Sequence, residues 1–171
     1  MLRYRVNLGW GQFTDFRDLT INGSGTITQA NLPFTDLEDL NGDGRSDIII
    51  VSPTEVRYAL NRGNVFDAFV TLDETSLGFS IPARGVNTRV LFADMNANGS
   101  EDIVWLEGSR VRYLELFPER PNLLSRVDNG IGSIQKISYG TAAEHQARAR
   151  AAGEPWTKSL QIPMAVVDRS D

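Results

Sequence analysis

The sequence lacks cysteine altogether and has a single histidine, His145, among its 171 residues. The lack of cysteine excludes disulfide bonds and thiolate metal sites. A catalytic triad or dyad built on histidine would have to use His145, and no nucleophile motif of the G-x-S-x-G type accompanies it. We therefore interpret His145 as a surface residue of a predicted helix, and we predict that the chain is not an enzyme.

A basic surface and a long apolar run are also missing. The 17 Lys and Arg residues against 22 Asp and Glu residues give a net charge of −5, and the arginines are scattered. This balance argues against a nucleic-acid partner, which needs a basic stripe. No run of 18 apolar residues exists, so we predict no membrane span. The first six residues alternate like a strand and lack the apolar core of a signal peptide.

The composition is that of a folded protein. Hydrophobic residues make up 41% of the chain and charged residues 23%, which is typical of a globular rather than a disordered chain. The length is sufficient for a sizeable core.

One nine-residue stretch, residues 39–47, carries the strongest signal; we call it the first loop. Oxygen-bearing side chains stand at its positions 1, 3, 5 and 9, and a glycine stands at position 6. This alternation lets a tight loop turn several oxygens toward one hard cation, as Ca²⁺ requires. The predicted ligands are four side chains and one backbone carbonyl: Asp39, Asn41, Asp43 and Asp47, with the carbonyl of Arg45.

A second copy of the pattern begins 55 residues later, at residues 94–102, which we call the second loop. Its predicted ligands are Asp94, Asn96, Asn98 and Asp102, with the carbonyl of Ser100. The first loop carries three carboxylates and the second carries two. Because affinity in such loops follows the charge of the ligands, we predict that the first loop binds Ca²⁺ more tightly.

The loops differ from EF-hands. An EF-hand requires a bidentate glutamate at position 12, where Ile50 and Trp105 stand here. Apolar β-branched runs follow both loops and predict buried strands rather than helices. The alternative to a metal site is a pair of Asp/Asn/Gly turns that need no metal.

The repeat extends beyond the loops. The tripeptide Val56-Arg57-Tyr58 recurs at residues 111–113, and a related tripeptide that begins at Leu2 precedes it. The complete unit predicts four strands, at residues 34–37, 47–51, 55–60 and 65–72, and we find no helical period in residues 1–117. Four antiparallel strands per repeat indicate β-propeller blades. The predicted fold class is therefore mainly β, with one complete four-stranded blade and two partial ones in residues 1–117.

Residues 1–117 hold too few blades for a closed propeller, which needs four to eight. We therefore expect the chain to be a piece of a longer protein. The remaining blades of that protein would be its first partners.

A second predicted domain, residues 118–171, begins where Pro118 and Pro121 interrupt the repeat. We expect a hairpin formed by residues 123–127 and 133–139, with an Asp-Asn-Gly turn between them. Thr141 and Glu144 form a capping-box pattern that predicts a helix over residues 142–152. Residues 156–167 return to extended structure. This domain is thus predicted to be an α+β segment with a hairpin and one short helix.

Two resemblances follow from these motifs. The loop-and-strand units at residues 39–51 and 94–106 resemble FG-GAP/VCBS repeats, the Ca²⁺-binding blades of integrin-α-like propellers. The second domain is similar to the middle/N-terminal region of the B component of insecticidal Tc toxins, which also occurs in the Salmonella virulence plasmid B protein and in RHS-repeat proteins. The segments that carry this second resemblance are residues 120–124, 128–132, 137–139 and 151–156, with Pro163 and residues 166–167.

The second resemblance implies a non-catalytic role in a toxin complex. In that family the B component carries a propeller that docks onto the A component and acts as a gate. With the C component it forms a hollow RHS-type shell that encloses the toxic part. The resemblance implies A and C components as partners, and a location outside the cell in the complex or in the bacterial cytoplasm before release. The alternative is an FG-GAP adhesion or carbohydrate-binding propeller at a cell surface.

Overall fold

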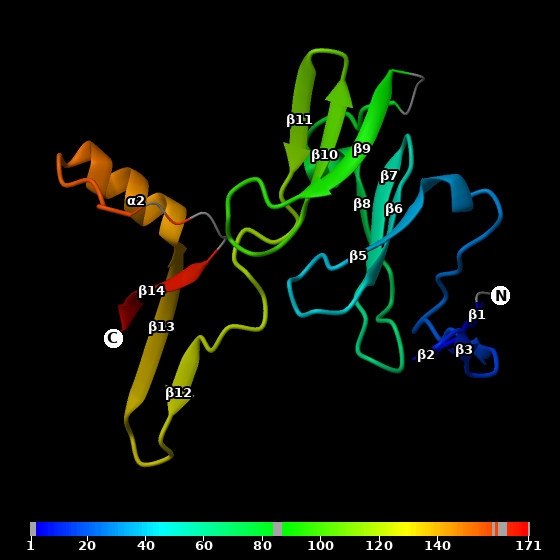
Figure 1. The fold of residues 1–171 in the computed structure, drawn as a ribbon, viewed down its shortest axis with the longest axis horizontal. Coiled ribbons are helices and arrows are strands. Elements are labelled where there is room, and N and C mark those ends of the chain that lie inside the picture. The colour runs from blue at the N-terminus through cyan, green and yellow to red at the C-terminus, as the bar shows by residue number, and fades with distance from the viewer. Residues whose placement is uncertain (1–2, 84–86, 159, 161–163, 171) are drawn as a thin grey trace. The chain divides into compact units, whose positions relative to one another are not determined.

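The computed structural model describes residues 3–83, 87–158, 160 and 164–170 (Figure 1). Leu2 of the predicted third repeat copy and Pro163 of the toxin resemblance lie outside the described residues. The chain forms two compact units: residues 1–38 with 45–89, and residues 39–44 with 90–171. The division thus passes through the first loop. The predicted domain boundary between residues 117 and 118 does not coincide with the division into these two units, and it stays a prediction.

The first unit contains a four-stranded antiparallel sheet in the order β5-β6-β7-β8 (Figure 1). Its strands are β5 (Thr35–Glu38), β6 (Asp47–Val51), β7 (Glu55–Ala59) and β8 (Val70–Asp73). Each strand pairs with the one before it in the sequence, as predicted for a blade. Strands β5, β6 and β7 lie within one residue of the predicted bounds.

The fourth strand is shorter than predicted, since β8 starts at Val70 rather than at residue 65. The reason is a different set of partners for Phe66. Its backbone N–H donates to the Thr20 carbonyl over 2.9 Å, and its carbonyl accepts from the Asn22 N–H over 2.9 Å. Phe66 thus forms one isolated bridge with Ile21 and another with Asn61 just after β7, and the continuous β7–β8 ladder begins only at Val70.

Strand β6 is the centre of this unit's core. All five of its residues are buried, because its apolar β-branched side chains are covered on both faces of the sheet. A cluster of buried residues on one face contains Ile48, Ile50, Ala59 and Phe66. Partly buried side chains from the preceding segment, η1 (Leu32–Phe34) and the stretch before β8 pack against it: Leu19, Ile21, Ile27, Phe34 and Phe69.

The N-terminal segment forms two short ladders, which pair β1 (Arg3–Tyr4) with β4 (Arg17–Asp18) and β2 (Asn7–Gly9) with β3 (Gln12–Phe13). The side chain of Asn7 accepts from the Gly9 N–H over 2.8 Å, and that of Asn61 accepts from the Gly63 N–H over the same distance. The two asparagines thus form the same hydrogen bond to the glycine two residues later.

One helix in the first unit was not predicted. Residues 1–117 show no helical period, yet α1 (Glu74–Leu77) forms a single turn after β8. Asp73 caps it by accepting from the Ser76 N–H over 2.8 Å, and the Ser76 side chain returns a bond to the Asp73 N–H. These hydrogen bonds also lower the pKa of Asp73 below its usual value. A reciprocal cap can hold one turn without an amphipathic repeat.

The second unit contains most of a three-stranded sheet in the order β11-β10-β9. Its strands are β9 (Thr88–Ala93), β10 (Asp102–Glu107) and β11 (Arg110–Leu114). The first four residues of β10 are buried and include the fully buried Trp105. Three strands were predicted here and three are present; that they belong to a further blade stays a prediction.

The rest of the second unit is a sheet in the order β12-β13-β14 with one helix. Strands β12 (Arg126–Asp128) and β13 (Ile134–Thr141) form the predicted hairpin, and β14 (Ala165–Ser170) pairs with β13. The predicted capping box opens α2 (Ala142–Ala151), since Thr141 and Glu144 exchange hydrogen bonds of 3.1 Å. In the described part of the chain, neither helix has the length and apolar character that crossing a membrane requires. The fold is mainly β, as predicted.

Candidate metal centres

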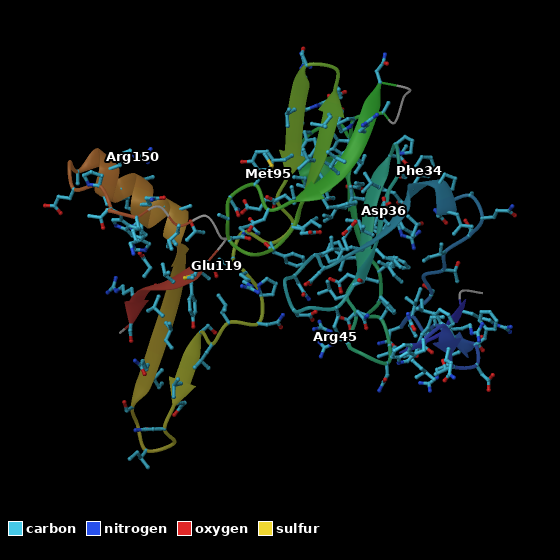
Figure 2. The ribbon with its side chains drawn as sticks, in the orientation of Figure 1. Phe34, Asp36, Arg45, Met95, Glu119 and Arg150 are labelled. Atoms are coloured by element: carbon cyan, nitrogen blue, oxygen red, sulfur yellow. The ribbon has the colours of Figure 1, made fainter. Side chains whose placement is uncertain are left out.

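The two predicted loops share an unusual backbone. Positions 4 and 6 have positive φ angles in both: 68° and 85° at Gly42 and Gly44, and 61° and 89° at Ala97 and Gly99. Glycine adopts this region without steric cost, whereas alanine does so rarely. The pattern of two left-handed residues winds each loop tightly between its strands. Arg45 and Met95, labelled in Figure 2, mark the two loops.

In the first loop, side-chain oxygens of positions 1 and 3 accept from backbone N–H groups. The Asp39 carboxylate accepts from the Asp43 N–H over 3.0 Å and from the Gly44 N–H over 2.8 Å. The Asn41 side chain also accepts from the Asp43 N–H, over 3.0 Å. These bonds bring the predicted ligands at positions 1, 3 and 5 together.

The second loop repeats this network with its own residues. The Asp94 carboxylate accepts from the Asn98 N–H over 3.0 Å and from the Gly99 N–H over 2.9 Å. The Asn96 side chain accepts from the Asn98 N–H over 3.0 Å. The network repeats because the two loops place the same acceptors and the same left-handed turns at the same positions.

The loops differ at position 9, where Asp47 and Asp102 are both fully buried. One oxygen of Asp47 accepts from the Asn61 N–H over 2.7 Å. In Asp102, Oδ2 accepts from the Met95 N–H over 2.9 Å, but Oδ1 has no hydrogen-bond partner among the described residues. Burial raises the pKa of Asp102 above its usual value, and the nearby charges of Glu115 and Asp94 raise it further. Asp102 is thus a buried carboxylate with one unpartnered oxygen and two carboxylates, Glu115 and Asp94, near it.

The residues at position 7 differ in exposure. Arg45 is exposed, whereas Ser100 is buried. The Ser100 N–H and hydroxyl donate to Asn98 Oδ1 over 2.8 and 2.5 Å. The roles predicted for the Arg45 and Ser100 carbonyls stay predictions.

One residue of this site lies outside the predicted set. Glu115 directly follows β11, and its Oε1 accepts from the side-chain amides of Asn96 and Asn98, the latter over 3.5 Å. The sequence does hold a signal for it: 55 residues earlier, the equivalent position is the apolar Leu60. The replacement of an apolar residue by an acidic one at the same repeat position is the sequence signal for Glu115. A comparison restricted to the two loops does not include this position.

Carboxylates by themselves do not complete either centre. Over residues 3–83, 87–158, 160 and 164–170, no three His, Asp or Glu side chains lie close enough together to hold a metal ion. A cation would therefore need amide and carbonyl oxygens as well, which the loop pattern supplies and which Ca²⁺ accepts. The second loop fits such a cation because it contains the unpartnered, buried Oδ1 of Asp102.

A cavity of about 510 Å³ lies beside the second loop, within the second unit. Asn96, Asn98 and Glu115 form part of its wall, and residues of β13 form another part. The side chains at positions 3 and 5 of the second loop are therefore accessible from a cavity large enough for a hydrated ion.

Arg120 contacts both loop segments of the second unit, residues 39–44 of the first loop and the second loop. Its guanidinium donates to the Gly42 carbonyl over 2.6 Å. A Cβ at Gly99 would lie 2.9 Å from the same guanidinium, and a Cβ at Gly42 would lie 2.2 Å from the Gly99 carbonyl. Gly42 and Gly99 thus allow a close backbone approach that larger residues would prevent.

His145 lies on α2, as predicted, and is partly exposed. Its Nε2 is 3.1 Å from the Asp168 carboxylate, within ion-pair range when the imidazole is protonated, although the angle is not that of a hydrogen bond. Asp168 also lies 3.5 Å from Arg148. This is a surface charge group on the second unit.

Comparison with known proteins supports both resemblances. Residues 39–105 match the model of the FG-GAP-like repeat family. No curated protein matches the sequence.

Solved structures of Tc toxins match the fold. A Tc holotoxin pore from Photorhabdus luminescens matches 98% of this chain with a TM-score of 0.73 and 24% sequence identity. Two crystal structures of TcdB2–TccC3, one without the hypervariable C-terminal region, each match 96% with a TM-score of 0.68 and 24% identity. In each case the chain spans only 8% of the length of the matched chain. The chain therefore has the mainly β fold of one region of these toxin chains, and it contains an FG-GAP-like repeat over residues 39–105.

Proposed function

We propose that this chain is a non-catalytic part of a Tc-toxin B-like protein, in which two Ca²⁺-binding loops stabilise neighbouring blades. The fold match over nearly the whole chain supports this proposal, and the repeated hydrogen-bond network of the two loops supports its metal component. A cell-surface adhesion propeller would share the FG-GAP-like repeat. It would not require the segment after residue 117, which the toxin structures also match.

Each loop would hold one Ca²⁺ through the residues of its own nine positions. In the first loop these are Asp39, Asn41, Asp43, Asp47 and the Arg45 carbonyl, and in the second they are Asp94, Asn96, Asn98, Asp102 and the Ser100 carbonyl. A bound ion would supply positive charge beside the buried carboxylates at position 9. The chain's own contribution is to pre-form the loop by hydrogen bonds and left-handed turns.

The same loops connect the strands that form the sheets. The first loop joins β5 to β6, and the second joins β9 to β10. An ion held by the ends of each loop would keep the flanking strands in register. The role of the ion is thus structural.

In a full-length protein we expect the chain to contribute to docking on the A component, to gating and to enclosure of the toxic part with the C component. We also expect that protein to act outside the cell as part of a toxin complex. These expectations rest on analogy with the matched toxin structures. They are tested by co-purification with Tc A and C components. Failure to co-purify with either, together with binding to immobilised glycans, would favour the adhesin.

The metal component is tested by thermal unfolding of the 171-residue chain in Ca²⁺ and in EDTA. A ligand that binds only the folded state at 100 times its Kd stabilises it by about 2.7 kcal/mol. We expect a higher Tm in Ca²⁺ than in EDTA, and no such difference in the Asp39→Asn/Asp94→Asn double variant. Equal Tm values for the unmodified chain in the two buffers would contradict the proposal.

A further inference from the structure

We propose that the open edge of β11 is a docking site for one added strand, an extended segment from outside this chain with alternating apolar residues and one acid. Strand β11 forms one edge of its three-stranded sheet, with β10 between it and β9 (Figure 1). In the four-stranded sheet the equivalent strand, β7, lies between β6 and β8. The inference goes beyond the proposed function and does not depend on Ca²⁺ binding.

The first argument is that β7 and β11 carry the same side chains in different surroundings. The Val-Arg-Tyr tripeptide of β7 recurs in β11. Val56 of β7 is 0% exposed, whereas Val111 of β11 is 56% exposed. Tyr58 is partly buried, whereas Tyr113 is 54% exposed. Two apolar side chains that the first sheet covers are therefore open at the edge of the second sheet.

The second argument is the path of the chain after β11. After β7 the chain turns back and forms β8 against it. After β11 it runs to the second loop instead, where the Phe117 carbonyl accepts from the Asn98 amide over 2.8 Å and from the Ser100 hydroxyl over 3.2 Å. Pro118 follows, and proline has no N–H to donate to a ladder. In the described part of the chain, no strand therefore pairs with this edge of β11.

The charged side chains of β11 do not by themselves prevent pairing. Charges on an edge strand often protect it against an added strand. However, Arg57 stands in β7 at the position of Arg112, and β7 pairs with β8 along this stretch. Arg112 is also held by an ion pair of 2.6 Å to Glu107 of the neighbouring strand β10. The edge of β11 thus resembles an edge that accepts a strand in the same molecule.

The register between β7 and β8 defines what the added strand should carry. Opposite the four β7 residues that end at Tyr58, β8 presents an apolar, a polar, an apolar and an acidic residue: Val70, Thr71, Leu72 and Asp73. Asp73 lies opposite Glu55 there, but the residue of β11 equivalent to Glu55 is Arg110, which is exposed. An acid at this place in the added strand would therefore face a cation, and opposite charges on paired strands stabilise the pairing.

The test adds a synthetic peptide with the sequence of residues 69–75, blocked at both ends, to the 171-residue chain and follows amide hydrogen exchange. We expect exchange in β11 to slow at least about threefold at about 1 mM peptide, with no change in β7, whose edge β8 already occupies. The matched control is the same peptide with Thr71→Pro. It should give no protection, because proline removes a donor from the ladder.

An exchange of charge tests the register and the chemistry of the partner. Arg110→Glu in the chain should weaken binding of the peptide about threefold or more, and Asp73→Lys in the peptide should restore it. The control variant, Arg89→Glu, makes the same charge change at an exposed residue of β9, the other edge strand of this sheet. It should change the affinity less than about twofold, since distant exposed charges are screened.

Three outcomes would overturn the proposal. The first is unchanged exchange in β11 up to about 10 mM peptide, or equal slowing with the proline peptide. The second is slower exchange in β9 instead of β11, which would place the added strand at the other edge. The third is association of the chain with itself in sedimentation experiments, with slow exchange in β11 before any peptide is added. That result would assign the edge to a second copy of the chain.

Discussion

The first and second loops have the same left-handed backbone positions and the same hydrogen bonds to the side chains at positions 1 and 3. The buried carboxylates at position 9 differ in their hydrogen-bond partners and in the charges near them. Asp47 accepts from the Asn61 N–H at the start of the turn after β7. Asp102 has an unpartnered oxygen and two negative neighbours. The residue equivalent to Asn61 in the second repeat is Leu116, which follows Glu115. A repeat can therefore keep the backbone shape of its loop while the strand end opposite the loop changes the electrostatics of the site.

The largest expected effect comes from Gly42, the position-4 residue of the first loop. In Gly42→Ala the new Cβ would lie 2.2 Å from the Gly99 carbonyl and 3.0 Å from Arg120, at a φ of 68°. We expect a loss of about 3 kcal/mol in the free energy of unfolding, measured by denaturant titration. The control is Gly44→Ala, which has a φ of 85° but no atom within 4 Å of the new Cβ. It should cost only about 1 kcal/mol, and equal losses would mean that the close approach is unimportant.

The next prediction compares the loss of stability when each position-9 aspartate is replaced by alanine in metal-free buffer. Asp47→Ala removes the acceptor of the Asn61 N–H and leaves that donor unpaired. Asp102→Ala also removes a bond, to the Met95 N–H, but it relieves a buried charge that lies near two other carboxylates. We expect Asp47→Ala to cost about 2 kcal/mol more than Asp102→Ala in EDTA. A larger loss for Asp102→Ala would show that its unpartnered oxygen is not a source of instability.

A smaller effect is expected for Arg120, which bonds the first-loop residue Gly42 and lies against Gly99 of the second loop. Arg120→Ala removes the 2.6 Å bond to the Gly42 carbonyl. We expect a loss of about 1.5 kcal/mol, because the bond is charge-assisted but the side chain is only half-buried. Arg150→Ala, in the last turn of α2, is the control and should change stability by less than about 0.5 kcal/mol. Similar losses would indicate that the bond to Gly42 contributes little.

The smallest effect is a gain in stability at position 4 of the second loop. Ala97 has a φ of 61°, where the first loop has glycine. Ala97→Gly should relieve the left-handed strain and raise the free energy of unfolding by about 0.5 to 1 kcal/mol, less the entropy that glycine adds to the unfolded chain. Hydrogen exchange of the second-loop amides would locate the gain. A net loss would mean that the alanine side chain makes compensating contacts.

Local features of the fold could be predicted because local residues cause them. The strand bounds of β5, β6 and β7 follow from apolar β-branched runs separated by turn residues. The cap of α2 follows from Thr141 and Glu144, which bond each other within one turn. The 55-residue repeat identified both loops, and the hydrogen bonds that shape positions 1 to 6 join residues within each loop.

Three features of the structure were not predicted from the sequence. Each depends on contacts between distant residues or on a segment too short to show a period. Strand β8 is shorter than predicted because Phe66 forms isolated bridges instead of a continuous ladder, one of them to Ile21, more than forty positions away in the chain. Helix α1 was missed because a single turn is too short to show a period, although Asp73 and Ser76 cap it. Glu115 was missed because its relation to the second loop exists only when β11 pairs with β10.

The sequence by itself determined the two loops, the order of the strands in the β5–β8 and β9–β11 sheets, and the capped helix. Each of these depends on residues that are neighbours in the chain, on side-chain alternation or on turn chemistry. Only the tertiary structure decided which buried carboxylate finds a donor and which does not. That outcome depends on the residue that each strand pairing brings opposite the loop: the Asn61 N–H beside Asp47, and Glu115 near Asp102. Such pairing joins residues 13 or 14 positions apart, and the free energy of a buried charge depends on those neighbours rather than on its own sequence motif.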